Sequence, residues 1–216
     1  MSNYYLELIL GTILLPAGIS GCRSASNGPL ISVSAEVETQ ISLALRPMLG
    51  QPIEIRLYSD SIFFPGISFW QGWRVPPFGA GMEDGRPDVA TSVGSDSVSL
   101  LVTRLADLPA VWKMLQKDSL PEGRTELDRV MILLNYTGQI LPSQVMHSQI
   151  DAERWLFKDS TNIRMITPPS ENQLPDKTII RFFARGPIGI MRYDFIVNED
   201  EMIINEEMIA EDLVHM

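Results

Sequence analysis

The sequence predicts an α+β fold that is rich in β-strand, mainly an antiparallel sheet, sandwich-like or curled, with one or two short helices. Apolar and polar residues alternate with period two in several short segments, as expected for half-buried strands. Glycine and proline, 15 residues of each, separate these segments. Helical periodicity is clear in one segment and plausible in a second, which is why few helices are expected.

The first candidate element is ambiguous between strand and helix. Apolar residues occupy alternate positions over 31–37 and again over 41–45, which favours a strand. A helix beginning at Ser34 is the alternative, and it would place four apolar residues on one face: Val37, Ile41, Ala44 and Leu45. The next segment is clearer. Ile53, Ile55 and Leu57 alternate with Glu54 and Arg56, which predicts a half-buried strand.

Further along the chain the same pattern predicts strands at 97–103, 129–136, 162–166 and 178–184. The best hairpin joins 191–197 to 202–209 through the polar tip 198–201. Apolar residues at helical spacing predict a short helix over 106–116. A second helix over 143–156 follows a Pro-Ser start signal. The polar, proline-bearing segment 168–177 is expected to be a surface loop.

Composition and charge exclude several classes of protein. The chain has 216 residues and is 45% hydrophobic and 20% charged, as ordinary globular domains are. Its formal net charge of −10 would repel nucleic acid, because phosphate binding depends on lysine and arginine. One cysteine and two histidines offer little material for a transition-metal site. We therefore expect no metal, no cofactor and no nucleic-acid partner.

The N-terminus combines an uncharged apolar run, Leu8 to Ile19, with Ile19-Ser20-Gly21-Cys22 at the only cysteine of the chain. This arrangement resembles the signal peptide and lipobox of bacterial lipoproteins. The resemblance implies that 1–21 is a signal peptide, that Cys22 carries lipid and that 22–29 is a tether to a single domain spanning 30–216. Arg23 stands where an aspartate marks inner-membrane retention, so the resemblance favours the outer membrane, facing the periplasm. The alternatives are an uncleaved signal anchor and a cytosolic protein with 8–19 buried in its core.

One region of the predicted domain differs from the rest. Residues 65–87 contain four prolines and five glycines, a density that predicts a long loop without regular elements. The loop also carries the aromatic residues Trp70, Trp73 and Phe78. We expect the indoles to pack under their own loop. Binding of a sugar, a peptide or a partner surface by these three residues is the alternative.

Sequence motifs for catalysis are mostly missing. Neither a nucleophile elbow nor a zinc-protease or nucleotide-binding motif occurs, and His147 has no sequence-local partner. We nominate no catalytic residue. The acidic stretch 83–88 is interpreted as a solvated turn, not a calcium site. Residues 199–216 contain seven acids and no base, which predicts a sheet edge with a charged outer face. A surface for a basic partner is the alternative.

These observations together favour a lipid-anchored, non-catalytic domain of a bacterial cell envelope. It would act by binding or by structural attachment, with the membrane and an envelope protein or glycan as partners. One alternative is an envelope hydrolase that uses carboxylates near the 65–87 loop. Another is a cytosolic assembly or regulatory module.

Overall fold

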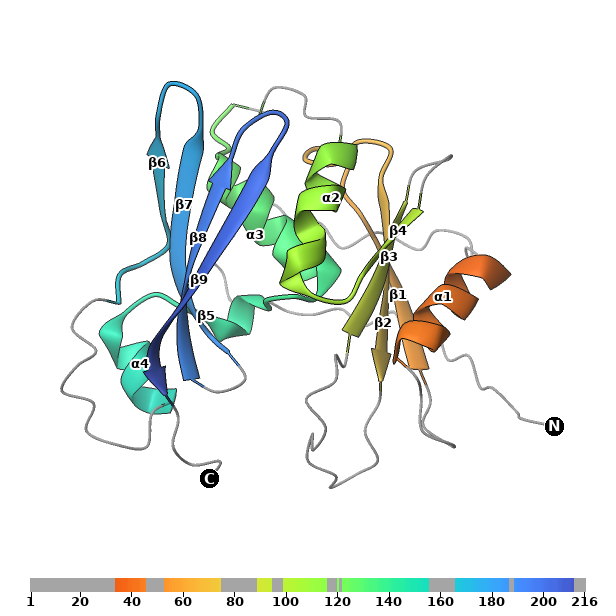
Figure 1. Cartoon of the computed structure of the whole chain (residues 1–216), viewed down its shortest axis with the longest axis horizontal. Coiled ribbons are helices and arrows are strands. Elements are labelled where there is room, and N and C mark those ends of the chain that lie inside the picture. The colour runs from red at the N-terminus through yellow and green to blue at the C-terminus, as the bar shows by residue number, and fades with distance from the viewer. Residues whose placement is uncertain are drawn as a thin grey trace.

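The computed structural model describes residues 34–45, 53–74, 89–94, 99–115, 120, 122–155, 166–186 and 189–211. Two antiparallel sheets stand face to face with helices α2 and α3 between them, and helix α1 lies on the far side of the first sheet (Figure 1). The predicted β-rich α+β class with mainly antiparallel sheet is confirmed. The described residues contain four α-helices, more than the one or two expected.

The first sheet, sheet A, is a simple meander in the order β1-β2-β3-β4. Its strands are β1 (Ile53–Ser59), β2 (Ser68–Arg74), β3 (Val89–Gly94) and β4 (Ser99–Val102). The strands predicted over 53–57 and 97–103 are therefore confirmed.

The prediction that 65–87 forms one long loop is wrong for residues 68–74, which form the central strand β2. The aromatic residues that were assigned to a loop favour strands, because they pack well on a pleated surface that is covered on both faces. Glycine and proline are concentrated on either side of β2. Residues 75–87, with Phe78, lie outside the described residues.

The second sheet, sheet B, has the order β5-β7-β8-β9, with β6 also paired to β7. Its strands are β5 (Val145–Met146), β6 (Ser170–Gln173), β7 (Thr178–Arg185), β8 (Gly189–Val197) and β9 (Met202–Glu211). The predicted strand 178–184 and the hairpin 191–209 are confirmed, and β9 is the expected acidic edge strand. The 168–177 segment is not only a loop, because β6 lies within it.

Helix α1 (Ala35–Leu45) replaces the strand that we favoured over 31–45, and the helical alternative is correct. Ile41 and Leu45 are fully buried against the outer face of sheet A, and Val37 and Ala44 pack beside them. Leu43, which the strand pattern would have buried, is 70% exposed. The segment follows the 3.6-residue period because only that period puts these four side chains on one face.

Helix α3 (Glu126–Thr137) replaces the strand predicted over 129–136. Thr125 and Asp128 form a capping box at its start, where the Thr125 hydroxyl accepts from the Asp128 backbone and the Asp128 carboxylate accepts from the Thr125 backbone. Gly138 ends the helix in the left-handed region, with φ of 69°. Val130, Leu133 and Leu134 are buried at helical spacing.

The two remaining helices are shorter. A 3₁₀ turn (Leu105–Asp107) leads into α2 (Leu108–Met114), which confirms the helix predicted over 106–116. The helix predicted over 143–156 is only partly correct, because a 3₁₀ turn (Pro142–Gln144) and β5 precede α4 (Gln149–Trp155). Of the strand predicted over 162–166, only Ile166 is described, and it lies outside any strand.

One apolar core joins the two sheets through α2 and α3. It includes Phe69 and Val93 from sheet A, Trp112 from α2, Leu133 from α3 and Phe182 from β7.

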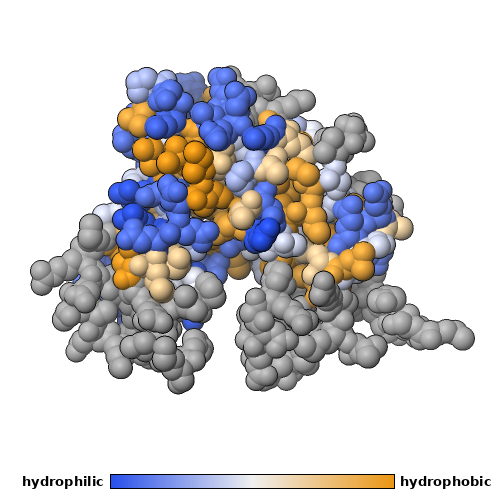
Figure 2. Space-filling view, in the orientation of Figure 1, coloured by the Kyte–Doolittle hydropathy of each residue, from blue (hydrophilic) through white to orange (hydrophobic). Residues whose placement is uncertain are grey.

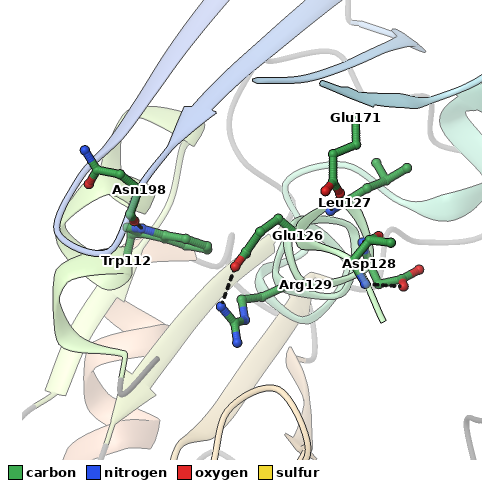
Figure 3. A network of polar contacts seen from close by, with 8 residues as sticks. Trp112, Glu126, Leu127, Asp128, Arg129, Glu171 and Asn198 are labelled. Carbon is green, nitrogen blue, oxygen red and sulfur yellow. Dashed lines mark hydrogen bonds and ion pairs between the residues drawn. The ribbon is translucent and has the colours of Figure 1, made fainter. Parts of the chain in front are cut away.

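Polar contacts also connect the helices with sheet B (Figure 3). The indole Nε1 of Trp112 donates to the backbone oxygen of Asn198 at 2.9 Å, and the backbone N–H of Leu127 donates to the carboxylate of Glu171 at 2.8 Å. In α3 itself, Arg129 is 4% exposed and bonds to Glu126. Side-chain hydrogen bonds thus attach both α2 and α3 to sheet B.

Candidate functional site

The outer face of sheet B, which points away from α2 and α3, is the best candidate for a functional surface. Helix α4 covers one end of this face, where Ala152 packs with Phe183 and Ile190. Beyond that end, side chains from β7, β8 and β9 form successive rows across the strands, because residues that are paired in register point to the same face.

The first row is aliphatic. Ile179 lies opposite Ile196, and Ile196 lies opposite Ile203, so three isoleucines from three neighbouring strands stand side by side. We call them the isoleucine row. Ile179 and Ile196 are half-buried and Ile203 is 43% exposed. In Figure 2, hydrophobic residues lie next to hydrophilic ones over the part of the molecule where sheet B is found.

The next two rows carry four charged residues, Arg181, Asp194, Arg192 and Glu207, which we call the charged cluster. The guanidinium of Arg181 donates through Nε and Nη2 to both carboxylate oxygens of Asp194, at 2.6 and 3.0 Å. Arg192 lies between two acids, with its Nε 3.5 Å from Asp194 and its Nη2 on Glu207. Paired cations and anions alternate along this cluster.

The cluster shifts the pKa values of two of its members, Asp194 and Arg181. The hydrogen bond from Arg181 lowers the pKa of Asp194 below its usual value, and the charges of Arg181 and Arg192 act in the same direction. The same bond raises the pKa of Arg181. Two-point bonding between a planar guanidinium and a carboxylate also fixes the orientation of both groups. The charged cluster is therefore an ordered surface with no net charge, on a chain whose overall formal charge is −10.

An aliphatic row beside arginines resembles a protein-binding surface in two respects, because the centre of such a surface is more apolar than the rest of the protein surface and arginine is enriched there. The arrangement can bind a complementary surface, which is the chemistry that we assign to it.

Trp70 and Trp73, which only the alternative interpretation of 65–87 treats as a joint binding site, point to opposite faces of sheet A because they are three positions apart in β2. Trp70 packs on the side of α1, beside Ile41 and Ala90. Trp73 lies on the α3 side, where its Nε1 donates to Oε1 of Gln71 at 2.6 Å. The two indoles therefore do not form one stacking surface. Trp70 belongs to the packing between sheet A and α1, and Trp73 lies on the face of sheet A that is turned toward α3.

Of the other residues that the sequence analysis singled out, only His147 lies among the described residues. Cys22 and the acidic stretch 83–88 lie outside the described residues, as does Phe78. His147 is exposed ahead of α4, and its backbone N–H donates to the carboxylate of Asp151. Within the described ranges, no group of three or more His, Cys, Asp or Glu side chains could hold a metal ion. In the same ranges no helix is both long and apolar enough to cross a membrane.

The sequence analysis missed the charged cluster, although a signal for it was present. The hairpin tip 198–201 fixes Val197 opposite Met202, and counting back from that pair places Arg192 opposite Glu207. The contact between Arg181 and Asp194 depends on the register of β7 with β8, which are also joined by a short connection, between Arg185 and Gly189. The backbone N–H of Gly186 donates to the backbone oxygen of Gly189, and counting back from that pair places Arg181 opposite Asp194.

Comparison of the chain with protein-family models, with curated protein sequences and with solved structures gives no match.

Proposed function

We propose that this chain is a lipid-anchored, non-catalytic domain of a bacterial cell envelope and that the outer face of sheet B is its docking surface for a protein partner. The apolar run Leu8 to Ile19 and the lipobox-like Ile19-Ser20-Gly21-Cys22 support the anchor. The isoleucine row beside the charged cluster supports the docking surface.

The observation that carries the proposal is the position of sheet B relative to the N-terminal end of the domain. Helix α1 is the first described element, and it lies on the opposite side of the molecule from sheet B (Figure 1). Neighbouring layers of helices and sheets pack about 10 Å apart, so the outer face of sheet B stands roughly 30 Å from α1. If the residues between Cys22 and α1 act as a tether, their number corresponds to a span of about 20 Å. An anchor at Cys22 would thus hold the α1 side toward the bilayer and leave sheet B facing outward.

Single-cysteine labelling tests this orientation. A lipidated Cys22 leaves no free thiol, so a cysteine introduced at an exposed position is the unique labelling site. Leu43 on α1 and Ile203 on β9 are both exposed aliphatic residues at opposite sides of the molecule. With a fluorophore at either position, we expect lipids that carry a headgroup quencher to quench the Leu43→Cys label more strongly. Equal quenching, or stronger quenching at Ile203→Cys, would contradict the proposed orientation.

The anchor itself is tested by the Cys22→Ala variant, which should leave the membrane fraction or accumulate as unprocessed precursor. Ser24→Ala, close to the same site, is the matched control and should fractionate like the wild type. A Cys22→Ala protein that fractionates and migrates like the wild type would contradict the anchor.

A further inference from the structure

The edge strand β9 is open over part of its length. It is the last strand in the described order of sheet B, and all four residues from Asn205 to Met208 are exposed although they point alternately to the two faces. Met208, on the inner face, is 46% exposed. At the other end of β9, Met202 is buried and α2 packs against the strand. Asn205–Met208 is thus the accessible part of this edge among the described residues.

The hairpin geometry shows which backbone groups point outward there. The backbone N–H of Asn198 donates to the backbone oxygen of Glu201 at 3.0 Å, so these two residues form a hydrogen-bonded pair of the antiparallel ladder. Such pairs alternate with non-bonded pairs along a ladder. Ile203, Asn205 and Glu207 therefore direct their backbone groups toward β8. The backbone N–H and C=O groups of Ile204 and Glu206 point away from the sheet, where another strand could pair with them.

The charges along this edge favour one kind of occupant. Arg192 on β8 pairs across the sheet with Glu207 on β9. A cation on a strand added beyond β9 would therefore continue the alternation of positive and negative charge from strand to strand. Glu206 presents a second carboxylate on the opposite face, and no basic residue occurs between 198 and 211. A second copy of this chain would bring Glu206 and Glu207 close to their own counterparts, and like charges on neighbouring strands are destabilising.

We propose that an extended, basic segment of a partner protein adds to β9 as a further strand of sheet B. This inference rests on the proposed role of sheet B as the docking surface and specifies how a partner binds there. Strand addition supplies affinity through main-chain hydrogen bonds and specificity through alternate side chains. The partner would place an apolar residue beside Ile203, extending the isoleucine row. Basic residues three and four positions away would lie beside Glu206 and Glu207.

A defined peptide tests this proposal with the full-length protein extracted in detergent. The probe is a fluorescent ten-residue threonine peptide that carries one valine and, three and four positions before it, two lysines, which is the order that antiparallel pairing with β9 requires. The same peptide with glutamate in place of lysine is the control. We expect fluorescence polarisation to show binding of the lysine peptide that is at least about tenfold tighter than that of the glutamate peptide. Equal affinity, or no binding of the lysine peptide at millimolar concentration, would overturn the proposal.

A pair of substitutions at one position separates strand addition from simple charge attraction. Glu206→Pro removes an N–H that points away from β8, and proline is tolerated on edge strands in that orientation. Glu206→Ala removes the same carboxylate but keeps the N–H. If both variants unfold at the wild-type temperature, we expect Glu206→Pro to bind the lysine peptide about tenfold more weakly than Glu206→Ala does. Equal affinities would overturn strand addition. If Glu206→Pro does not fold, Glu207→Lys is tested in its place. This variant should bind the glutamate peptide more tightly than the lysine peptide, the reverse of the wild-type preference. An unchanged preference for the lysine peptide would overturn the proposal.

Two further variants keep this inference distinct from the proposed function. Ile196→Lys alters the docking face on the central strand β8 but leaves the backbone of the β9 edge intact, and it should weaken peptide binding less than Glu206→Pro does. If Ile196→Lys weakens binding while Glu206→Pro does not, the peptide lies across the face, which overturns strand addition and leaves the docking surface in place. Cys22→Ala should bind the peptide as the wild type does, so a failure of lipid anchoring does not alter this test.

Discussion

Trp112 and Asn198, which are 86 positions apart in the sequence, are joined by a hydrogen bond from the indole Nε1 to the backbone oxygen at 2.9 Å. The indole is buried in the core between the sheets, and Asn198 lies at the tip of the β8–β9 hairpin. This contact attaches the hairpin that carries the proposed docking edge to α2. The position of β9 therefore depends on a residue in the middle layer.

Substitutions of Trp112 should separate packing from hydrogen bonding. Trp112→Phe keeps a ring in the core but loses the donor, and we expect a loss of about 1 kcal/mol in the free energy of unfolding. Trp112→Ala also leaves a cavity and should cost about 3–5 kcal/mol. Urea unfolding measures both values. A Trp112→Phe variant as stable as the wild type would show that the bond to Asn198 contributes nothing.

Gly72 should be required for the packing of α1 on sheet A. A β-carbon at this position would overlap the Cγ2 atom of Ile41. Gly72→Ala should therefore displace α1 and cost about 1–3 kcal/mol, as overpacking usually does. Ile41→Ala removes the overlapping atom, so the double variant should lose less stability than the sum of the two single changes. Simple additivity in thermal unfolding would contradict this contact.

Trp73 should matter through its hydrogen bond as well as its ring. Its Nε1 donates to Gln71, whose amide in turn donates to the backbone oxygens of Asn135 and Tyr136 at the end of α3. Gln71 is buried, so Trp73→Phe leaves its side-chain oxygen without this donor and should cost about 1–3 kcal/mol. Trp70→Phe is the matched control and should cost less. The opposite order of stabilities would contradict this role for Gln71.

The charged cluster should give the protein an acid-dependent part of its stability. The pKa of Asp194 is lowered in the folded state, chiefly by the hydrogen bond from Arg181. The stabilisation is therefore complete above the ordinary aspartate pKa of about 3.9 and is lost as the pH falls through the lower folded-state value. Asp194→Asn should be less stable than the wild type at neutral pH, and the difference should shrink below about pH 4. Asp200→Asn, at the hairpin tip, is the control. A difference that stays constant with pH would contradict this account.

The sequence was sufficient where a local pattern and the tertiary environment agree. The hairpin 191–209 alternates in polarity and has a short polar tip, so its strands, its register and the acidic edge could all be predicted. Helix α3 was mistaken for a strand because its apolar run was considered without its ends. The capping box of Thr125 with Asp128, and Gly138 after the last turn, are local signals that identify this helix.

Other features could not be predicted from local patterns. Both periods fit the apolar residues of α1, and burial of Ile41 and Leu45 against sheet A selects the helix. The glycine and proline residues around β2 predicted a loop for this segment. Its strand structure comes from pairing with β1 on one side and β3 on the other. The charged cluster needs the register of β7 with β8 as well as that of β8 with β9, and the sequence analysis did not join the strand predicted over 178–184 to the hairpin that follows it.

The intact mass of the protein extracted from bacterial membranes, together with the identity of its first residue, tests the central claim most directly. We expect the chain to begin at Cys22 and its mass to exceed that of residues 22–216 by the mass of covalently attached lipid. A chain that still begins at Met1 and carries no added lipid would contradict the proposed anchor and, with it, the outward orientation of sheet B.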